Sequence, residues 1–314
     1  MAEIGNDMQR AKDFLERGEL VAIPTETVYG LAGNALNPDA VAKIFIVKDR
    51  PHFDPLIVHL AKFDSISTYA SEIPGDANLL AKKFWPGPLT LLLPKRNIIP
   101  DLVTSGLDRV GLRCPDHILT HQLLQELSFP LAAPSANPFG YVSPTTPEHV
   151  NEQLGTKISY ILDGGPCKVG VESTIIGFDN SLPVVYRMGG LSIEEIENVV
   201  GPLKIQTHSS SNPNAPGQLK SHYAPRKKVI LGEIEKLLQH YPAHRSGILT
   251  FQKDFNSPFQ IILSPRGSMK EAAQNFFRAL REFDRMPIEF ILAEFLPEEG
   301  LGRAINDKLR RASA

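Results

Sequence analysis

Uncharged hydrogen-bonding side chains are concentrated in residues 131–145, LAAPSANPFGYVSPT. Ser135, Asn137 and Ser143 are spaced among prolines, and a residue that precedes proline is biased toward extended backbone, so these side chains are expected on a stiff path. Polar loops that leave an apolar strand often carry function. Two interpretations stay open at this point: the floor of a ligand pocket, or an ordinary surface turn.

The motif KDRP contains two cations, Lys48 and Arg50, and Arg50 directly precedes Pro51. The proline disfavours a helical Arg50, so a helix over residues 38–48 is expected to end near Lys48 and to leave both cations on one side of an extended segment. A lysine beside an arginine fork suits the several oxygens of a polyphosphate. A solvated helix end is the other interpretation. His59, after a short apolar strand, either binds a carboxylate or caps that strand.

Alternating residues on two further strands present polar groups to one face. Arg109 and Arg113 flank VGL, and in a strand their side chains point the same way, so one of them is expected near a carboxylate or a phosphate. Thr25, Thr27 and Tyr29 alternate in the same manner after a buried strand. That pattern suits a small polar ligand or a half-exposed strand edge.

The sequence contains none of the common nucleotide, metal or nucleophile motifs: no G-x-x-x-x-G-K-[ST], G-x-G-x-x-G, H-E-x-x-H, G-x-S-x-G or C-x-x-C. What remains is a set of cations and hydroxyls without an activated nucleophile: Lys48, Arg50, Arg109, Arg113 and Arg187, with Thr25, Thr27, Ser135, Ser143 and Ser173. Such residues would bind a nucleotide and a small zwitterion and would catalyse by orientation and by neutralising charge at phosphorus.

The composition is that of an ordinary globular chain: 314 residues, 42% hydrophobic and 22% charged, long enough for two domains. The net charge is −2, but residues 1–200 carry 16 basic against 24 acidic side chains and the remainder 17 against 11. An acidic first part argues against a broad nucleic-acid face there, whereas the basic second part suits either RNA or solvent. No secretory signal or membrane-spanning run is recognised, so we expect a cytoplasmic location without membrane contact, and we assign the two cysteines no role.

Alternating apolar strands and amphipathic helices predict an α/β chain. The first domain, residues 1–200, is expected to have helices at 7–17, 38–48, 77–85, 116–127, 147–154 and 192–200 and strands at 20–23, 56–58, 89–93, 109–113, 130–133, 160–162, 174–178 and 182–187. Residues 201–228, rich in Ser, Pro and Asn, form a linker or a functional lid. Residues 229–314 form a small α/β domain with a mainly parallel sheet, from strands at 229–231, 248–251, 259–263 and 288–292 and helices near 233–240, 268–284 and 302–312.

Six motifs occur in order along the first domain: IPTETVYGL; KDRP with PLIVH; FWPGPLT; VGLR; APSAN with SPT; and ESTI followed by RMGG. Together they resemble the YrdC-like domain of threonylcarbamoyl-AMP synthases, over residues 8–200. HYAP in the linker and GLGRAIND near residue 300 are similar to the long, two-domain form of that family. The resemblance implies an open, twisted α/β sheet with a concave basic cleft, followed by a smaller Rossmann-like α/β domain.

The resemblance also implies a nucleotidyltransferase reaction. L-Threonine, bicarbonate and ATP would give L-threonylcarbamoyl-adenylate and pyrophosphate, the first half of the synthesis of N6-threonylcarbamoyladenosine in tRNA. Mg²⁺ would enter with ATP, and no protein ligand for it is assigned. A downstream tRNA threonylcarbamoyl-transferase machinery would receive the product, and weak RNA binding is expected.

Site residues carried over from the resemblance fall into two sets. The set implied for ATP comprises Lys48 and Arg50, which are also the catalytic pair, with Asp54, Arg109, Ser135, Asn137, Ser143, Arg187 and Tyr223. The set implied for L-threonine comprises Thr27, His59, Arg113, the backbone of Ala133, and Ser173. Tyr223, in the linker, would reach back over the nucleotide as part of a lid that excludes water.

The chain departs from the family pattern at Asp54, where Asn is usual, and at Arg109, where a small hydroxyl residue is usual. An acid beside triphosphate oxygens is unfavourable unless Mg²⁺ bridges it or Arg109 compensates its charge.

The main alternative is a double-stranded RNA or tRNA-binding module without catalytic activity, because a concave basic α/β surface can hold a duplex by its phosphates and 2′-hydroxyls. A carbamoyl-phosphate-using transferase with a related domain would need further modules, such as zinc-type cysteine clusters, which this sequence lacks.

Overall fold

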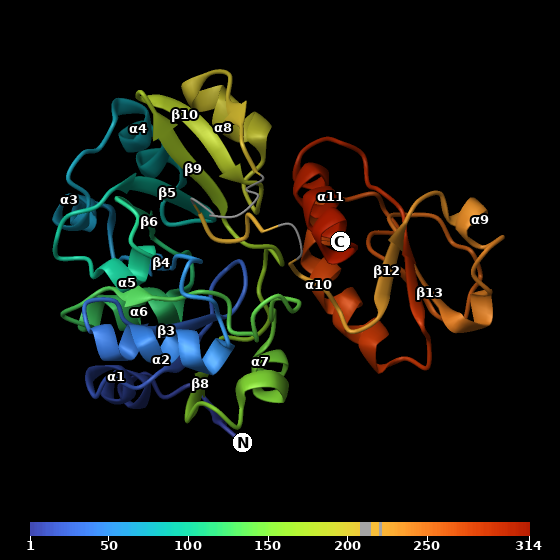
Figure 1. Cartoon of the computed structure of the whole chain (residues 1–314), viewed down its shortest axis with the longest axis horizontal. Coiled ribbons are helices and arrows are strands. Elements are labelled where there is room, and N and C mark those ends of the chain that lie inside the picture. Colours follow the sequence, from blue (N-terminus) through green and yellow to red (C-terminus); the bar gives the residue numbers. More distant parts are fainter. Residues whose placement is uncertain (208–214, 220–221) are drawn as a thin grey trace.

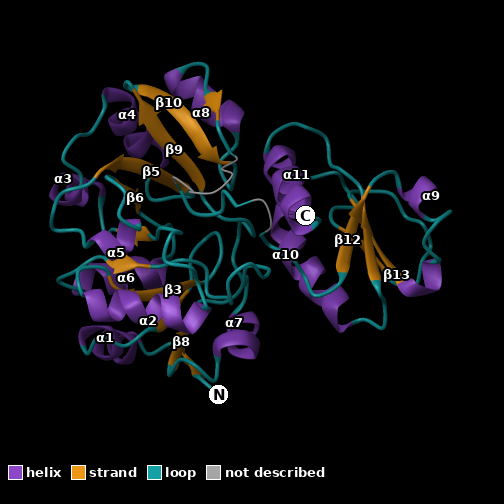
Figure 2. Ribbon diagram, viewed as in Figure 1, coloured by secondary structure: helices purple, strands orange, loops and turns teal. Residues whose placement is uncertain are grey.

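Two units, each with its own sheet, make up the computed structural model, which describes residues 1–207, 215–219 and 222–314. Figure 1 shows the larger unit on the left and the smaller one, orange to red, on the right. Helices and strands are interspersed in both units (Figure 2), so the predicted α/β class is confirmed. Within the described ranges, no helix combines the length and the apolar character needed to cross a membrane.

The larger unit begins at β1 (Glu3–Gly5) and ends at β11 (Lys204–Ile205). Its other strands are β2 (Val21–Ile23), β3 (Gly30–Asn34), β4 (Ile57–His59), β5 (Leu89–Pro94), β6 (Arg109–Arg113), β7 (Leu131–Ala132), β8 (Tyr160–Leu162), β9 (Thr174–Asp179) and β10 (Leu182–Arg187). Its α-helices are α1 (Met8–Glu16), α2 (Pro38–Lys48), α3 (Ile66–Tyr69), α4 (Gly75–Phe84), α5 (Asp101–Thr104), α6 (Ile118–Glu126), α7 (Pro147–Leu154) and α8 (Ile193–Val200). Because β11 pairs with β10, the segment predicted as a linker starts with a strand of the large sheet.

The described strands of this unit form one mixed sheet in the order β1-β8-β2-β3-β7-β4-β6-β5-β9-β10-β11. In its middle β4 runs parallel to β6, which places His59 beside Arg113. β7 runs antiparallel to β4, and Leu131 lies opposite His59. The sheet therefore brings a histidine, an arginine and the start of the polar loop to one place.

Local signals in the sequence explain where several helices begin and end. The Asp7 side chain accepts from the backbone at the start of α1, and Gly18 takes the predicted left-handed conformation just after that helix (φ 73°). Asn37 caps α2. Ser192 and Glu195 form a reciprocal capping box at α8, so the backbone amides of these two residues both have side-chain partners.

Residues 24–29 form a bent loop, and the prediction that Thr25, Thr27 and Tyr29 share one face of an extended strand is wrong. The Thr25 hydroxyl donates to the Val28 carbonyl (2.6 Å) and accepts from the Thr27 and Val28 amides (3.2 Å each), so it closes a turn. The Tyr29 hydroxyl instead donates to the Gly165 carbonyl (2.8 Å).

The expected extended segment from Lys48 to Arg50 is also absent. Lys48 is the last residue of α2, and Asp49 caps the helix in the left-handed conformation (φ 52°). The helix ends between the two cations, and each of them reaches its own set of partners.

The smaller unit is a wholly parallel sheet of the described strands in the order β12-β15-β13-β14, in agreement with the predicted mainly parallel sheet. The strands are β12 (Lys228–Leu231), β13 (Ser246–Thr250), β14 (Gln260–Ile262) and β15 (Phe290–Ala293), and the α-helices are α9 (Ile234–Leu237), α10 (Met269–Arg285) and α11 (Leu301–Ala312). Figure 1 shows α10 and α11 on the side of this sheet that faces the larger unit.

The hydrophobic core of the smaller unit extends into the larger one. Val28, Val142 and Val171, from three loops of the larger unit, belong to the same buried cluster as Phe276 and Phe277 of α10. Apolar burial is the main source of stability in such an interface. The smaller unit therefore supports the loops that carry the predicted site.

Candidate functional site

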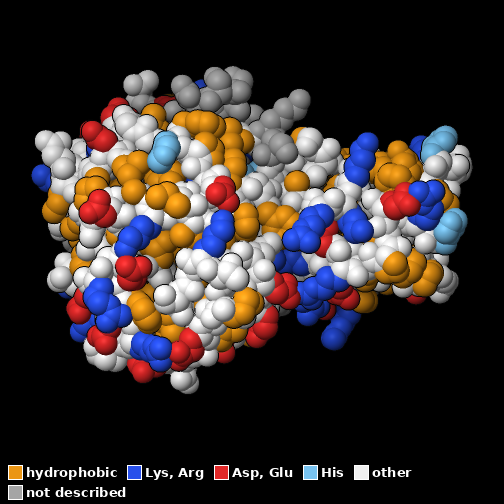
Figure 3. All heavy atoms as spheres, turned by 60° about the horizontal axis from the view of Figure 1, so that its bottom comes forward, with side chains coloured by type: hydrophobic (Ala, Val, Ile, Leu, Met, Phe, Trp, Pro, Cys, Tyr) orange, Lys and Arg blue, Asp and Glu red, His pale blue; other side chains and the backbone are white. Residues whose placement is uncertain are grey.

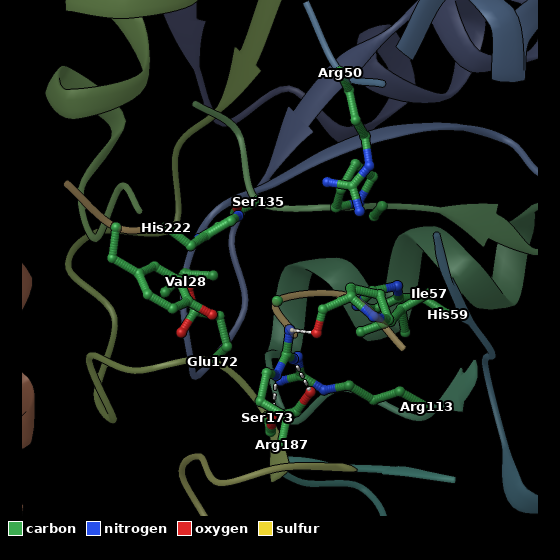
Figure 4. A pocket seen from close by; sticks show the side chains of 15 residues that line it. Val28, Arg50, Ile57, His59, Arg113, Ser135, Glu172, Ser173, Arg187 and His222 are labelled. Carbon is green, nitrogen blue, oxygen red and sulfur yellow. Dashed lines mark hydrogen bonds between the residues drawn. The ribbon is translucent and has the colours of Figure 1, made fainter. Parts of the chain in front are cut away.

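A pocket opens where the loops of the larger unit meet the linker. Eight predicted site residues line it: Arg50, His59, Arg113, Ala133, Ser135, Ser173, Arg187 and Tyr223. Seven further residues line it that the sequence did not single out for a site: Val28, Ile57, Pro134, Glu172, Pro216, Gly217 and His222. In Figure 4 Arg50 extends from one side of the pocket, and Ser173 and Arg187 lie together on the opposite side.

Lys48 lies beneath the pocket and does not line it. Its ammonium donates to the backbone carbonyls of Ser135 and Asn137, and the residue is buried. Burial, and then the charge of Arg50, place the pKa of Lys48 well below the usual value for lysine. Lys48 therefore holds the polar loop in place.

Arg50 and Asp54 form a buried ion pair, with 2.9 Å between Arg50 Nη2 and an Asp54 carboxylate oxygen. Arg50 also donates to the Asp54 and Pro55 carbonyls (3.0 and 2.7 Å). Burial raises the pKa of the Asp54 carboxyl, and Arg50 opposes that shift. Of the two ways in which the charge of Asp54 could be compensated, by Mg²⁺ or by Arg109, the second is excluded, because Arg109 pairs with Asp179 and the cation beside Asp54 is Arg50.

Arg109 lies at the start of β6, outside the lining of the pocket. Its guanidinium contacts Asp179 (3.3 Å) and the Tyr186 hydroxyl (3.2 Å). These partners lie on β9 and β10, so Arg109 ties the strands of the sheet together. The structure gives it no position facing a ligand in the pocket.

The guanidinium of Arg113 is held by three residues of the larger unit. Its Nη2 lies 2.7 Å from Glu26 Oε2 and donates to the Thr27 hydroxyl (2.9 Å), and its Nε donates to the Gly87 carbonyl (3.3 Å). Thr27 does not line the pocket, but its hydroxyl orients the arginine that does.

His59 is buried beside Arg113 at the end of β4. Burial, and then the charge of Arg113, lower the pKa of His59 to about 3, so the ring is neutral at pH 7. Its Nδ1 has no hydrogen-bond partner among the described residues. A neutral ring with an unpartnered nitrogen on a pocket wall can hydrogen-bond a ligand.

Within the polar loop, Ser135 and Ala133 line the pocket, whereas Asn137 and Ser143 shape it. The Asn137 amide donates to the carbonyls of Pro138 and Tyr141 (2.8 Å each), which closes the loop on itself. The Ala133 amide donates to the Ile57 carbonyl (3.0 Å), so it serves the sheet.

Arg187, at the end of β10, has only neutral partners among the described residues. It donates to the Ser173 carbonyl and hydroxyl (3.0 Å each) and to the Pro216 carbonyl (3.3 Å). Thr90 holds the same Ser173 hydroxyl at 2.7 Å. In the described part of the chain, Arg187 forms no ion pair with a carboxylate, and it lines the pocket, so its charge is available to an anionic ligand.

The linker covers one side of the pocket with Pro216, Gly217, His222 and Tyr223. The His222 and Tyr223 rings contact each other at 4.2 Å between centroids, and Tyr223 packs on Phe277 of α10 at 5.6 Å. Residues 208–214 and 220–221 of the predicted linker lie outside the described residues. The described linker residues thus join the pocket to the smaller unit.

Basic side chains on the smaller unit are interspersed with acidic ones on the face shown in Figure 3. Several of them form exposed ion pairs, including Arg245 with Glu289 and Lys253 with Glu235. Such pairs reduce the positive potential that a nucleic-acid backbone would meet.

Fold and site together define a two-unit α/β protein with a buried, cation-lined pocket. A family model described as "Telomere recombination" matches residues 13–189, and one described as "Threonylcarbamoyl-AMP synthase, C-terminal domain" matches residues 191–314. The chain belongs to the family of threonylcarbamoyl-AMP synthases.

Individual relatives match over nearly the whole chain. The threonylcarbamoyl-AMP synthase of Pyrococcus abyssi is 43% identical over 96% of this chain and 93% of its own length. That of Bacillus subtilis is 40% identical over 98% and 94%. The crystal structure of P. abyssi Sua5 complexed with L-threonine is 42% identical, with a TM-score of 0.93, and the match covers 98% of this chain and 94% of that one.

Proposed function

We propose that this chain synthesises L-threonylcarbamoyl-adenylate from L-threonine, bicarbonate and ATP, with release of pyrophosphate. The observation that carries the proposal is the pocket itself, which is lined by Arg50, Arg113 and Arg187. Among the described residues, Arg187 has no carboxylate partner. The full-length relatives named threonylcarbamoyl-AMP synthase and the L-threonine complex of a protein of the same fold support it.

The chemistry balances without a covalent enzyme intermediate. The deprotonated amine of threonine combines with bicarbonate to give a carbamate and water. A carbamate oxygen attacks the α-phosphorus of ATP, the bond to the bridging oxygen breaks, and pyrophosphate leaves. The protein has to hold the two substrates in line and neutralise charge on the triphosphate, which are the main contributions to phosphoryl-group chemistry in general.

The residues of the pocket suit these two tasks. We assign the carboxylate of threonine to Arg113, whose fork Thr27 and Glu26 hold in place. We assign the triphosphate to Arg187, Arg50 and Ser135, with Lys48 holding the polar loop in place. Neutral His59 would hydrogen-bond the amino acid and would not act as its base, because a pKa of about 3 gives it little affinity for a proton at pH 7.

Mg²⁺ would arrive bound to the phosphates of ATP and would neutralise part of their charge. Within the described residues, no group of three or more His, Cys, Asp or Glu side chains is arranged to hold a metal ion. The phosphate oxygens would therefore supply most of its ligands.

The product is a mixed anhydride that water destroys, so a second enzyme system has to transfer the threonylcarbamoyl group to adenosine in tRNA. We propose that this chain supplies that tRNA threonylcarbamoyl-transferase machinery, and that it works in the cytoplasm, where ATP and tRNA are found. Weak RNA binding by the basic smaller unit would assist such a transfer.

The test is pyrophosphate release from ATP with threonine and bicarbonate together and with each omitted. We expect release only in the complete mixture. Release that needs neither substrate would overturn the proposal, and RNA binding that falls steeply with salt, in the absence of any pyrophosphate release, would favour an RNA-binding module.

A further inference from the structure

Lys308, on α11 of the smaller unit, is fully buried against the site of the larger unit. Its ammonium lies 3.5 Å from Glu172 Oε2, donates to the Met188 carbonyl (2.9 Å), and sits 5.3 Å from the centre of the Tyr223 ring. All three contacts are with segments that border the pocket. A side chain of the smaller unit thus contacts residues that line the pocket of the larger unit.

Stability alone does not explain a charge at this position. A buried ion pair often contributes no more to stability than apolar residues of the same volume, because both charges lose their hydration. A methionine at position 308 could fill the same space. The ammonium is therefore better explained by what it does to the carboxylate it faces.

Glu172 is the one acidic residue that lines the pocket within the described part of the chain. Its Oε1 accepts from the Ser143 hydroxyl at 2.5 Å, whereas its Oε2 has no hydrogen-bond partner there. It directly precedes Ser173, which holds Arg187. Without a counter-charge, this carboxylate would place a negative charge on the wall of a pocket that takes a triphosphate.

The other two carboxylates at the site are each matched by a cation of the larger unit, Glu26 by Arg113 and Asp54 by Arg50. Glu172 is matched across the interface between the units. We propose that Lys308 is a positioning residue for ATP: it neutralises Glu172 and so keeps the wall beside Arg187 favourable for the triphosphate. This inference rests on the proposed function.

Other charged or titratable groups around this pair are few. Tyr223 and Arg187 face it from the linker and from β10, and Asp307 and Arg311 face it from α11. Burial lowers the pKa of Lys308, and the charges of Glu172 and Asp307 oppose that shift.

The experiment is calorimetric titration of ATP into the full chain without threonine, for wild type and for Lys308→Met. At pH 8 we expect binding to weaken on the order of tenfold, because Glu172 is then an uncompensated charge on the pocket wall at an effective dielectric constant near 20. A purely structural role of Lys308 would not be rescued by a further substitution at Glu172, the carboxylate that it faces. Arg310→Met, on the same helix but paired with Glu298 in solvent, is the matched control and should leave ATP binding unchanged.

Two more variants complete the cycle. Glu172→Gln should bind ATP at least as tightly as wild type, and Glu172→Gln with Lys308→Met should return to within about threefold of it, because no uncompensated charge is left. A double variant as weak as Lys308→Met, or a Glu172→Gln variant weaker than wild type, would overturn the inference. If Lys308→Met does not fold, those two variants still decide it. Threonine-dependent pyrophosphate release by wild type tests the proposed function separately, so the two failures are distinguishable.

Discussion

Replacing Arg50 by methionine tests the reasoning about buried charge at this site most severely. Asp54 is completely buried and pairs with Arg50 at 2.9 Å, and its remaining charged neighbours, Lys48 and Arg187, make no ion pair with it. Breaking a buried pair by removing one partner costs about 3–5 kcal/mol, because a charge is left uncompensated. We expect Arg50→Met to lose that much free energy of unfolding at pH 8.

The loss should depend on pH in a defined direction. Burial already raises the pKa of Asp54, and without Arg50 it would rise further. A carboxyl whose folded-state pKa lies above its unfolded value of about 3.9 binds a proton more tightly when folded, so the penalty is absent at low pH and grows as the pH rises through the folded pKa. The deficit of Arg50→Met should therefore shrink as the pH is lowered from 8 toward 5.

Urea unfolding at pH 8 and pH 5 measures both effects. Adding Asp54→Asn to Arg50→Met should restore most of the stability, since the uncompensated carboxylate is removed as well. Lys43→Met, which removes one partner of an exposed pair with Glu19, is the control and should change the unfolding free energy by less than about 1 kcal/mol. A loss below about 1 kcal/mol at pH 8 for Arg50→Met, or a loss that is the same at both pH values, would refute the reasoning.

Three further outcomes are expected. In steady-state assays of pyrophosphate release, Arg187→Met should lower kcat/KM for ATP about 10- to 100-fold, since charge-assisted hydrogen bonds contribute about 1.5–3 kcal/mol. Arg113→Met should chiefly raise the KM for threonine. The reverse pattern would exchange the two assignments. In wild type the folded-state pKa of His59, about 3, lies below its unfolded value, so the free energy of unfolding falls by up to about 1.4 kcal/mol per pH unit as the pH is lowered from 6.5 to 4. His59→Gln should make the free energy of unfolding less dependent on pH over this range. The same slope in the variant and in wild type would count against a buried neutral ring. Gly217→Ala should weaken ATP binding in a calorimetric titration, because φ is 79° at this residue and a Cβ would lie 2.8 Å from the Tyr223 hydroxyl. A variant that binds ATP with wild-type affinity would show that this part of the linker does not shape the pocket.

Helices and strands with strong local patterns could be predicted from the sequence alone. The segments Pro38–Lys48, Arg109–Arg113, Pro147–Leu154 and Leu182–Arg187 have the bounds that apolar periodicity indicates. β3, Gly30–Asn34, could not be found in this way, because GLAGN has poor strand propensity and is held by pairing with β2 and β7.

The site was predictable to the extent that its chemistry follows residue type. Serines, cations and a histidine identified the lining, but not which of them reach the pocket. Lys48 and Asn137 lie at the site yet spend their hydrogen bonds on the backbone of the loop, which only the tertiary structure reveals. Glu172 lies in the ESTI motif, but the sequence does not show its pairing with Lys308, because the two residues meet only when the second unit packs against the first.

The most direct test of the proposed activity uses ¹³C-bicarbonate, L-threonine and ATP with mass spectrometry of the nucleotide products. The expected result is an adenylate that carries threonine and one ¹³C atom, formed together with an equal amount of pyrophosphate. ADP and phosphate as products, or an adenylate without the ¹³C atom, would contradict the activity proposed for this pocket.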